Sequence, residues 1–258
     1  MRTPIVIANW KMHKTLIEAR HFIAELLQKV STPKCQIGLA APYTALDGCS
    51  KALSGTAILL GAQNIHEKSS GAYTGEISAD MVKDAGAKFS LIGHSERRKY
   101  FSETNSIIQK KIEAAITKNI IPILCVGETL EERENTQKIL EKQLAECLGK
   151  LSSDQLGNLI IAYEPVWAIG TGKAASPLEA NEAHRYIRSY CGARYSQKFA
   201  NQVRIIYGGS VQPNNVQSLM LQPNIDGLLI GGASLEAASF IEIILSLIHI
   251  SEPTRLGM

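Results

Sequence analysis

The stretch AYEPVWAIGTGK, residues 162–173, places a carboxylate, a rigid hinge and a glycine-rich loop directly after one another. It begins within the apolar run NLIIAY, residues 158–163. A continuous apolar run of this length is typical of a strand buried on both faces, as in a parallel sheet. Glu164 is then predicted at the carboxyl end of that strand, where Pro165 favours extended backbone.

The second half of this stretch changes from stiff to permissive backbone. Gly170 and Gly172 allow backbone angles that residues with side chains resist. A stiff start and a permissive end favour a hinged lid, and a surface turn in which Trp167 covers the core is the alternative. The predicted lid consists of Pro165, Val166, Trp167, Ala168, Ile169, Gly170, Thr171, Gly172 and Lys173.

Strand-like runs alternate with helix-like segments about eight times along the chain, which is the pattern of βα units around a parallel sheet. The 258 residues would allow two domains, but no linker divides them, and α/β barrels of this length are common. We expect one eight-stranded parallel (β/α)8 barrel over residues 1–244, with an open doubly wound sheet as the alternative. The expected strands are 5–8, 36–40, 57–61, 89–93, 121–126, 158–163, 203–207 and 225–230.

The composition is that of a globular protein, with 45% hydrophobic and 20% charged residues. No apolar run reaches membrane-spanning length, and the N-terminus lacks the pattern of a signal peptide. A net charge of +3 with interspersed signs gives no footprint for nucleic acid. Five widely spaced cysteines indicate neither a disulfide framework nor a zinc site. We therefore expect a cytoplasmic protein with reduced thiols, no membrane segment and no metal.

Polar residues follow two of the predicted strands, at the face where barrels of this type carry their active sites. Asn9 and Lys11 leave the first strand in NWK, with Trp10 directed to the opposite side. His94 and Glu96 leave the fourth in GHSERRKY. Taken singly, a lysine at such a position is usually a solvated surface charge, and a histidine is more often a structural residue than a catalyst.

Two glycine pairs follow the seventh and eighth predicted strands, in YGGS (207–210) and IGGAS (230–234). Each pair alone is a weak turn signal. Together they occupy the positions where many barrels bind phosphate with backbone N–H groups. Because neither a GxGxxG nor a GxxxxGK[ST] pattern is present, a small phosphate ester is favoured over a dinucleotide or a nucleoside triphosphate.

These segments together resemble the triosephosphate isomerase family. The resemblance covers residues 4 to about 244 in order. It rests on NWKMH, GAQN (61–64), GAYTGEIS, IGHSERR, CVGE, AYEPVWAIGTGK, YGGSV and GLLIGGASL. It implies interconversion of dihydroxyacetone phosphate and D-glyceraldehyde 3-phosphate through an enediol(ate), in glycolysis and gluconeogenesis, without a metal or organic cofactor.

The resemblance also implies a role for each site residue. Glu164 would be the base that removes a proton from carbon, and His94 would polarise the carbonyl as a neutral imidazole. Lys11 would supply a fixed positive charge, and Asn9 a hydrogen-bond donor to the developing oxyanion. Glu96 would orient Lys11 or relay protons. The expected phosphate contacts are Asn9, Lys11, Gly170, Ser210, Gly231 and Gly232.

Residues 63–76 resemble the family's third loop, which inserts into a second subunit, so the resemblance implies a homodimer. Gln63, Thr74 and Glu76 are the expected contact residues, with Thr74 reaching toward Asn9 and Lys11 of the neighbour. A flexible surface loop is the alternative that the composition of 69–75 allows.

Two features stay outside this set of roles. Cys125 lacks a sequence-level activator, which favours a small core residue over a nucleophile. The tail 245–258 departs from the family: LSLIHISEPTR resembles a translated sequencing-library adapter, and a divergent extension is the alternative. Pro253 opposes continuation of a helix in either case.

Two other function classes remain open at this level. Another phosphosugar isomerase would share the glycine-rich ends but should lack the combined Asn9, Lys11, His94 and Glu164. A barrel that binds a sugar phosphate or a protein without turnover is the other class, since a fold alone does not fix function.

Overall fold

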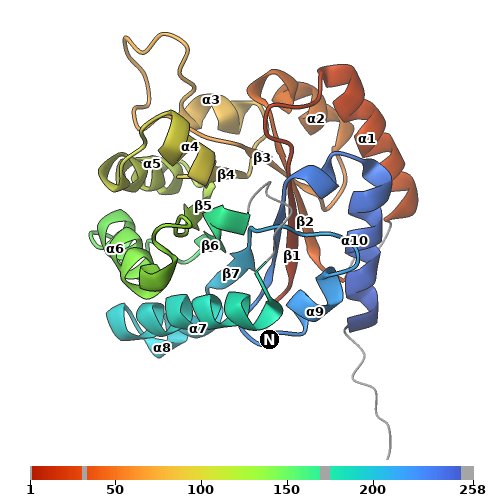
Figure 1. Cartoon of the computed structure of the whole chain (residues 1–258). Helices are drawn as coiled ribbons and strands as arrows, with labels where there is room; N and C mark the ends of the chain where they lie inside the picture. Colours follow the sequence, from red (N-terminus) through yellow and green to blue (C-terminus); the bar gives the residue numbers. More distant parts are fainter. Residues whose placement is uncertain (1, 31–33, 169–174, 251–258) are drawn as a thin grey trace, which may run out of the picture.

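The computed structural model describes residues 2–30, 34–168 and 175–250, and side chains as far as Leu247. Within them, eight parallel strands form a closed barrel in sequence order, surrounded by helices (Figure 1). The strands are β1 (Ile5–Asn9), β2 (Gln36–Ala41), β3 (Leu59–Ala62), β4 (Phe89–Ile92), β5 (Ile121–Val126), β6 (Ile160–Tyr163), β7 (Arg204–Tyr207) and β8 (Gly227–Ile230).

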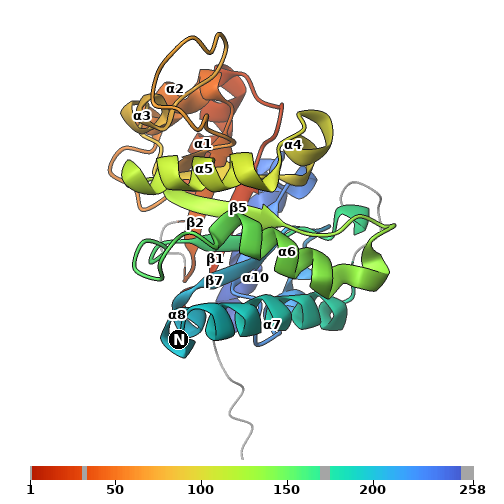
Figure 2. The same ribbon diagram turned by 90° about the vertical axis from the view of Figure 1, so that its left-hand side faces the viewer.

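The helices lie outside the barrel. Figure 2 shows α5, α6 and α7 lying side by side across one outer face. The α-helices are α1 (Leu16–Lys29), α2 (Leu46–Ala52), α3 (Ala79–Asp84), α4 (Ser95–Tyr100), α5 (Asn105–Thr117), α6 (Thr136–Leu148), α7 (Pro177–Arg194), α8 (Gln197–Gln202), α9 (Val216–Met220) and α10 (Ala237–Ile250). Short 3₁₀ helices are η1 (Tyr43–Ala45), η2 (Arg133–Asn135), η3 (Val166–Ala168) and η4 (Gly232–Ser234).

The predicted barrel is confirmed, because β1 pairs with β8 as well as with β2. This closure excludes the open doubly wound sheet. Strand ends differ from the prediction by one or two residues for local reasons. The sixth strand begins at Ile160 because Leu159 N–H still donates to Leu156 O, at 2.8 Å, in the preceding turn.

Inside the barrel, large and small side chains from neighbouring strands complement one another. Phe89 of β4 lies against Gly61 of β3 and is about 1% exposed. A Cβ atom built on Gly61 would lie 2.2 Å from the Phe89 ring, so this position requires glycine. A close-packed interior of this kind fixes the strand ends that carry the site residues.

Two long helices begin with matching signals. Thr15 caps α1 and Ser176 caps α7, and in each case a glutamate at the third helical position completes a capping box. These glutamates are Glu18 in α1 and Glu179 in α7. Pro177 occupies the first position of α7, where no backbone N–H is needed for a hydrogen bond within the helix. The chain that follows 169–174 is therefore anchored at a defined helix start.

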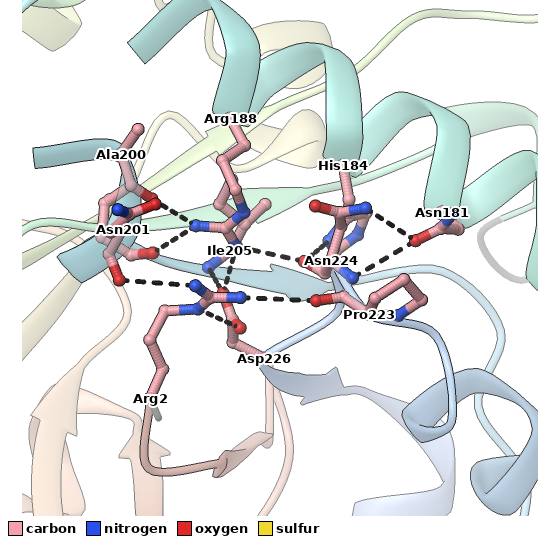
Figure 3. Close-up of polar contacts among 11 residues, drawn as sticks. Arg2, Asn181, His184, Arg188, Ala200, Asn201, Ile205, Pro223, Asn224 and Asp226 are labelled. Carbon is pink, nitrogen blue, oxygen red and sulfur yellow. Dashed lines mark hydrogen bonds and ion pairs between the residues drawn. The ribbon is translucent and has the colours of Figure 1, made fainter. Parts of the chain in front are cut away.

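The amino ends of the strands are joined by a charged network around Asp226 (Figure 3). Arg2 Nε donates to Asp226 Oδ1 at 2.6 Å, and Arg188 of α7 donates to Asp226 Oδ2 at 2.5 Å. Ile205 N–H of β7 also donates to this carboxylate, at 2.8 Å. The network links the N-terminus, β7, β8 and α7 at the face opposite to the glycine-rich ends, which reads as a stability feature.

His184 of α7 is fully buried beside this network. Its Nδ1 atom lies 3.3 Å from Asn224 O, and its ring packs edge to face against Tyr163. Burial lowers the pKa of His184 to about 3, so the imidazole is neutral in the folded protein.

The helix α10 continues past residue 244, where the sequence begins to depart from the family pattern. Leu247 belongs to the helix-facing core and is about 6% exposed. Residues 251–258, including Pro253, lie outside the described residues. That residues 245–258 are foreign to the protein stays a prediction.

Candidate active site

Five strand ends bring predicted site residues together at the carboxyl face of the barrel. They line a cavity of about 250 Å³. Its walls include Asn9 and Lys11 from the end of β1, His94 after β4, Glu164 after β6, Ser210 after β7, and Gly231 and Gly232 after β8. Seven predicted site residues, distant in sequence, therefore share one small hollow.

Glu164 follows β6 directly and is about 1% exposed. Its backbone N–H donates to Val126 O of β5 at 2.7 Å, which extends the strand pairing to this residue. Oε2 accepts a hydrogen bond from Ser95 N–H at 2.9 Å. Oε1 is buried and accepts no hydrogen bond from the described residues, which leaves it as the oxygen able to take a proton.

His94 faces this oxygen, with Nε2 lying 3.1 Å from Glu164 Oε1. The histidine is the N-cap of α4, and its Nδ1 accepts a hydrogen bond from Glu96 N–H at 3.2 Å. A ring nitrogen that accepts from an N–H carries no proton itself. The contact at Nδ1 therefore fixes the ring at the start of α4, with Nε2 directed toward Glu164.

Lys11 provides the cationic side of the site. Its Nζ lies 2.6 Å from Glu96 Oε1, and both side chains are partly exposed. Its backbone has φ 51°, a conformation that residues with side chains rarely adopt, and its N–H donates to Asn9 Oδ1 at 3.1 Å. Such local strain, held by a side chain, is common at functional sites.

Glycines let these side chains approach the ends of the neighbouring strands. A Cβ atom on Gly208 would lie 2.9 Å from Glu164 Cγ, and one on Gly231 would lie 3.2 Å from Lys11 Cε. The role of Gly208 was missed in the sequence, where YGGS indicates only a turn or a phosphate loop. Position 208 requires glycine because the Glu164 side chain, at the end of β6, lies against it, and the sequence alone does not show this contact.

Trp10 and Cys125 occupy the positions that the sequence predicts. Trp10 is fully buried in the outer, helix-facing core and packs edge to face against Phe22. Cys125 is fully buried in the barrel interior, and burial raises the pKa of its thiol well above the usual value. A thiol in this setting is a core residue.

Part of the predicted lid lies in the described residues. Pro165 leads into η3, which holds Val166, Trp167 and Ala168. Trp167 Nε1 donates to Glu128 Oε1 at 2.8 Å, and the Tyr163 hydroxyl donates to the same oxygen at 3.0 Å. The remaining lid residues, Ile169, Gly170, Thr171, Gly172 and Lys173, lie outside the described residues.

Glu128 and Ser95 are contributors that sequence reasoning missed. Glu128 is buried, which raises the pKa of its carboxyl. A glutamate two residues after the end of β5 could have signalled a strand-end role. Ser95 acts through its backbone N–H, so its side chain carries no signal.

The predicted third loop projects away from the barrel between β3 and α3 (Figure 1). Residues 68–76 are exposed along its length, including Thr74 and Glu76. Gln63 at its base donates to Ala40 O at 3.0 Å. Thr74 and Glu76 are not among the residues that line the cavity of their own chain.

Comparisons with known proteins agree with this site. The sequence pattern of the triosephosphate isomerase family matches residues 4–247. The chain belongs to the triosephosphate isomerase family. Triosephosphate isomerase of Alkaliphilus metalliredigens is 47% identical over 246 residues, covering 95% of this chain and 99% of the relative. That of Citrifermentans bemidjiense is 49% identical over 247 residues, covering 95% and 98%.

A solved structure shows the same architecture. The crystal structure of triosephosphate isomerase from Bartonella henselae superposes with a TM-score of 0.86 at 37% identity, covering 95% of this chain and 99% of that chain. Within the described residues, no helix has the length and apolar character needed to cross a membrane. The described part of the chain also holds no group of three or more metal-ligating His, Cys, Asp or Glu residues.

Proposed function

We propose that this site interconverts dihydroxyacetone phosphate and D-glyceraldehyde 3-phosphate, as a triosephosphate isomerase of glycolysis and gluconeogenesis. The observation that carries the proposal is the pairing of a buried carboxylate with an imidazole in one cavity of about 250 Å³. Membership of the family supports the same reaction.

The reaction moves one proton between adjacent carbons. Glu164 Oε1 takes the proton from the carbon beside the carbonyl, while His94 Nε2–H donates to the oxygen that becomes negative. The resulting enediol(ate) then receives a proton on the neighbouring carbon. A proton also passes from the hydroxyl on the first carbon to the former carbonyl oxygen, which completes the change from ketose to aldose. The proposed base and polarising group lie 3.1 Å apart and line one cavity, so both can reach the reacting atoms of a single bound substrate.

Lys11 and Asn9 stabilise charge in this mechanism. The Lys11 ammonium lies beside the developing enediolate and the phosphate, and Asn9 donates from a fixed amide. Glu96 holds the ammonium in place through its 2.6 Å contact, which supports an orienting role. Because Lys11 is about 27% exposed at the side chain, part of its field is screened until a ligand excludes water.

The phosphate binds at the glycine-rich ends of β7 and β8. Ser210 and Gly232 line the cavity, and Gly232 starts η4, whose first N–H groups have no partner within the helix. Gly170 belongs to the same proposed set by family resemblance. These residues hold the phosphate dianion away from the Glu164 carboxylate, so the two negative groups lie at opposite ends of the substrate.

We also propose a homodimer formed through residues 63–76. A second hollow of about 300 Å³ opens beside Asn9 and Lys11, and its walls include Met12, Tyr43 and Phe101. Met12 is about 96% exposed and Phe101 about 65% exposed, a large apolar surface for a single chain. The projecting loop of a second copy would fill this hollow, with Thr74 near Asn9 and Lys11.

The cytoplasm is the proposed compartment. All five cysteines are buried and unpaired in the described residues, as expected of a protein that works under reducing conditions.

A coupled assay tests the proposed reaction. Production of glyceraldehyde 3-phosphate from dihydroxyacetone phosphate is followed with purified protein, and other phosphosugars serve as comparison substrates. Rapid turnover of the triose phosphates alone supports the proposal. Binding without turnover would identify a non-catalytic barrel, and preference for another phosphosugar would identify a different isomerase.

A further inference from the structure

Arg133, the first residue of η2, contacts two elements that flank residues 169–174. Its guanidinium carbon lies 4.2 Å from the centroid of the Trp167 ring in η3. Its Nη2 lies 2.5 Å from Glu179 Oε1 in the first turn of α7. One side chain therefore joins the end of the catalytic strand to the helix that follows.

Both partners of Arg133 are themselves held by other groups. Trp167 Nε1 donates to Glu128 Oε1, and Val166 N–H donates to Glu128 O at 3.0 Å. Glu179 Oε2 accepts from Ser176 N–H at 2.9 Å as part of the capping box of α7. The arginine thus bridges two anchored points, in contrast to an isolated surface ion pair between two mobile side chains.

The two contacts of Arg133 require a positive charge, and a flat guanidinium suits them best. A guanidinium can lie over an indole face and at the same time donate from its edge to a carboxylate. The indole edge of Trp167 is occupied by Glu128, so the Arg133 contact fixes the ring from its face. Together the two contacts define both the position and the tilt of the indole.

A shift of Trp167 would also shift Glu164, the proposed base, because the backbone between the two residues is short and stiff. Ala168 N–H donates to Pro165 O at 2.8 Å, which makes residues 165–168 one compact turn. Pro165 restricts the backbone next to Glu164. Along the chain, Pro165 is the only residue between Glu164 and the start of η3 at Val166.

We propose that Arg133 is a positioning residue for the isomerisation, which holds η3 against η2 and α7 and thereby fixes the carboxylate of Glu164. The inference rests on the proposed function of Glu164 as the base. It concerns the chemical step, because the cavity residues that would hold phosphate after β7 and β8 make no contact with Arg133 in the described structure.

The test compares Arg133→Gln and Arg133→Lys with Arg194→Gln as the matched control. Arg194 lies at the other end of α7, over the Tyr195 ring at 5.4 Å, and donates to Gly149 O at 2.9 Å. The control therefore removes the same kind of contact from the same helix, far from the cavity. The measurements are kcat and KM with dihydroxyacetone phosphate, the melting temperature, and tryptophan emission.

We expect Arg133→Gln to lower kcat about three- to tenfold with KM within about twofold of the parent, as for the loss of a modest positioning contact. Arg133→Lys should restore at least half of that loss, because an ammonium can also lie over the ring and pair with Glu179. Trp10 is fully buried, so a change in emission in Arg133→Gln reports on Trp167.

Several results would overturn the inference while the parent chain remains an active isomerase. These are a kcat for Arg133→Gln equal to that of Arg194→Gln, an effect on KM alone, or no recovery in Arg133→Lys. An inactive parent chain would instead refute the proposed function, and the two failures are therefore distinguishable.

Discussion

His94 Nε2 lies 3.1 Å from Glu164 Oε1, and the two residues reach this distance from the ends of β4 and β6. Each is held on its far side by a backbone N–H: Glu96 N–H donates to His94 Nδ1, and Ser95 N–H donates to Glu164 Oε2. The start of α4 therefore orients both groups. Both side chains line the same cavity.

Glu164→Asp keeps the charge and withdraws the carboxylate by about one methylene. We predict that kcat falls roughly 100-fold or more, because proton abstraction depends on placement within about 1 Å. Binding of phosphoglycolate should largely survive, since the glycine-rich ends are unchanged. Steady-state kinetics measure kcat, and calorimetry measures the binding of phosphoglycolate. Near-normal turnover would show that Glu164 is not the base.

Gly208→Ala tests how closely the seventh strand end must approach Glu164. The added Cβ would lie 2.9 Å from Glu164 Cγ, so the carboxylate must shift. We predict a kcat roughly 10- to 100-fold lower with a native-like circular dichroism spectrum. Gly192→Ala, within α7, is the control. Equal activity of the two variants would show that the carboxylate does not need this space.

Phosphoglycolate combines a phosphate with a carboxylate and so resembles the enediolate in charge. We predict competitive inhibition against dihydroxyacetone phosphate in the parent chain. Lys11→Met should weaken this inhibition, because the variant removes the ammonium that lies beside Gly231. Non-competitive inhibition would place the phosphate outside the cavity formed by the strand ends.

The proposed dimer predicts a concentration-dependent assembly that depends on Met12. Met12→Glu should shift the protein toward monomers in sedimentation velocity, because a buried carboxylate without a partner is costly. Leu221→Glu is the control, since Leu221 is also exposed, at about 62%, but follows α9. A parent chain that sediments as a monomer would refute the proposed interface.

His184 predicts a contribution of pH to stability. Its pKa is lowered to about 3 in the folded protein, against about 6.5 in the unfolded chain. The stabilisation of the folded state is therefore complete above about pH 6.5, and it is lost as the pH falls toward 3, because only the unfolded chain takes the proton.

This contribution changes by at most about 1.4 kcal/mol per pH unit. Urea unfolding of the parent and of His184→Gln, compared between pH 7 and pH 4.5, measures it. The parent should lose more stability over this interval than the variant. Parallel pH dependences would show that His184 does not carry the effect.

Much of the fold was predictable because most strands are short apolar runs that end in, or are followed by, glycine or a polar residue. The closure of the barrel follows from the repeat count. Side-chain partnerships were not predictable in the same way. Gly208 is required by Glu164 and Gly61 by Phe89, and each pair comes from different strands whose relative register only the folded barrel sets.

The site was predictable where function depends on residue type. His94, Glu164 and Lys11 carry titratable groups at strand ends, so the sequence shows them. Ser95 contributes a backbone N–H, and Arg133 contributes a contact with a distant tryptophan, and neither has a local pattern. Their roles depend on the position of α4 and η2 relative to β6.

Isomerisation in deuterium oxide tests the central claim most directly. If Glu164 carries the proton between adjacent carbons through an enediol(ate), a proton held on its carboxylate can exchange with solvent before it returns. The triose phosphates recovered after turnover by the parent chain should then carry deuterium at the exchanging carbon, as detected by mass spectrometry or proton NMR. Glu164→Gln should produce neither product nor label. Rapid isomerisation without any deuterium in the recovered triose phosphates would contradict proton transfer through Glu164.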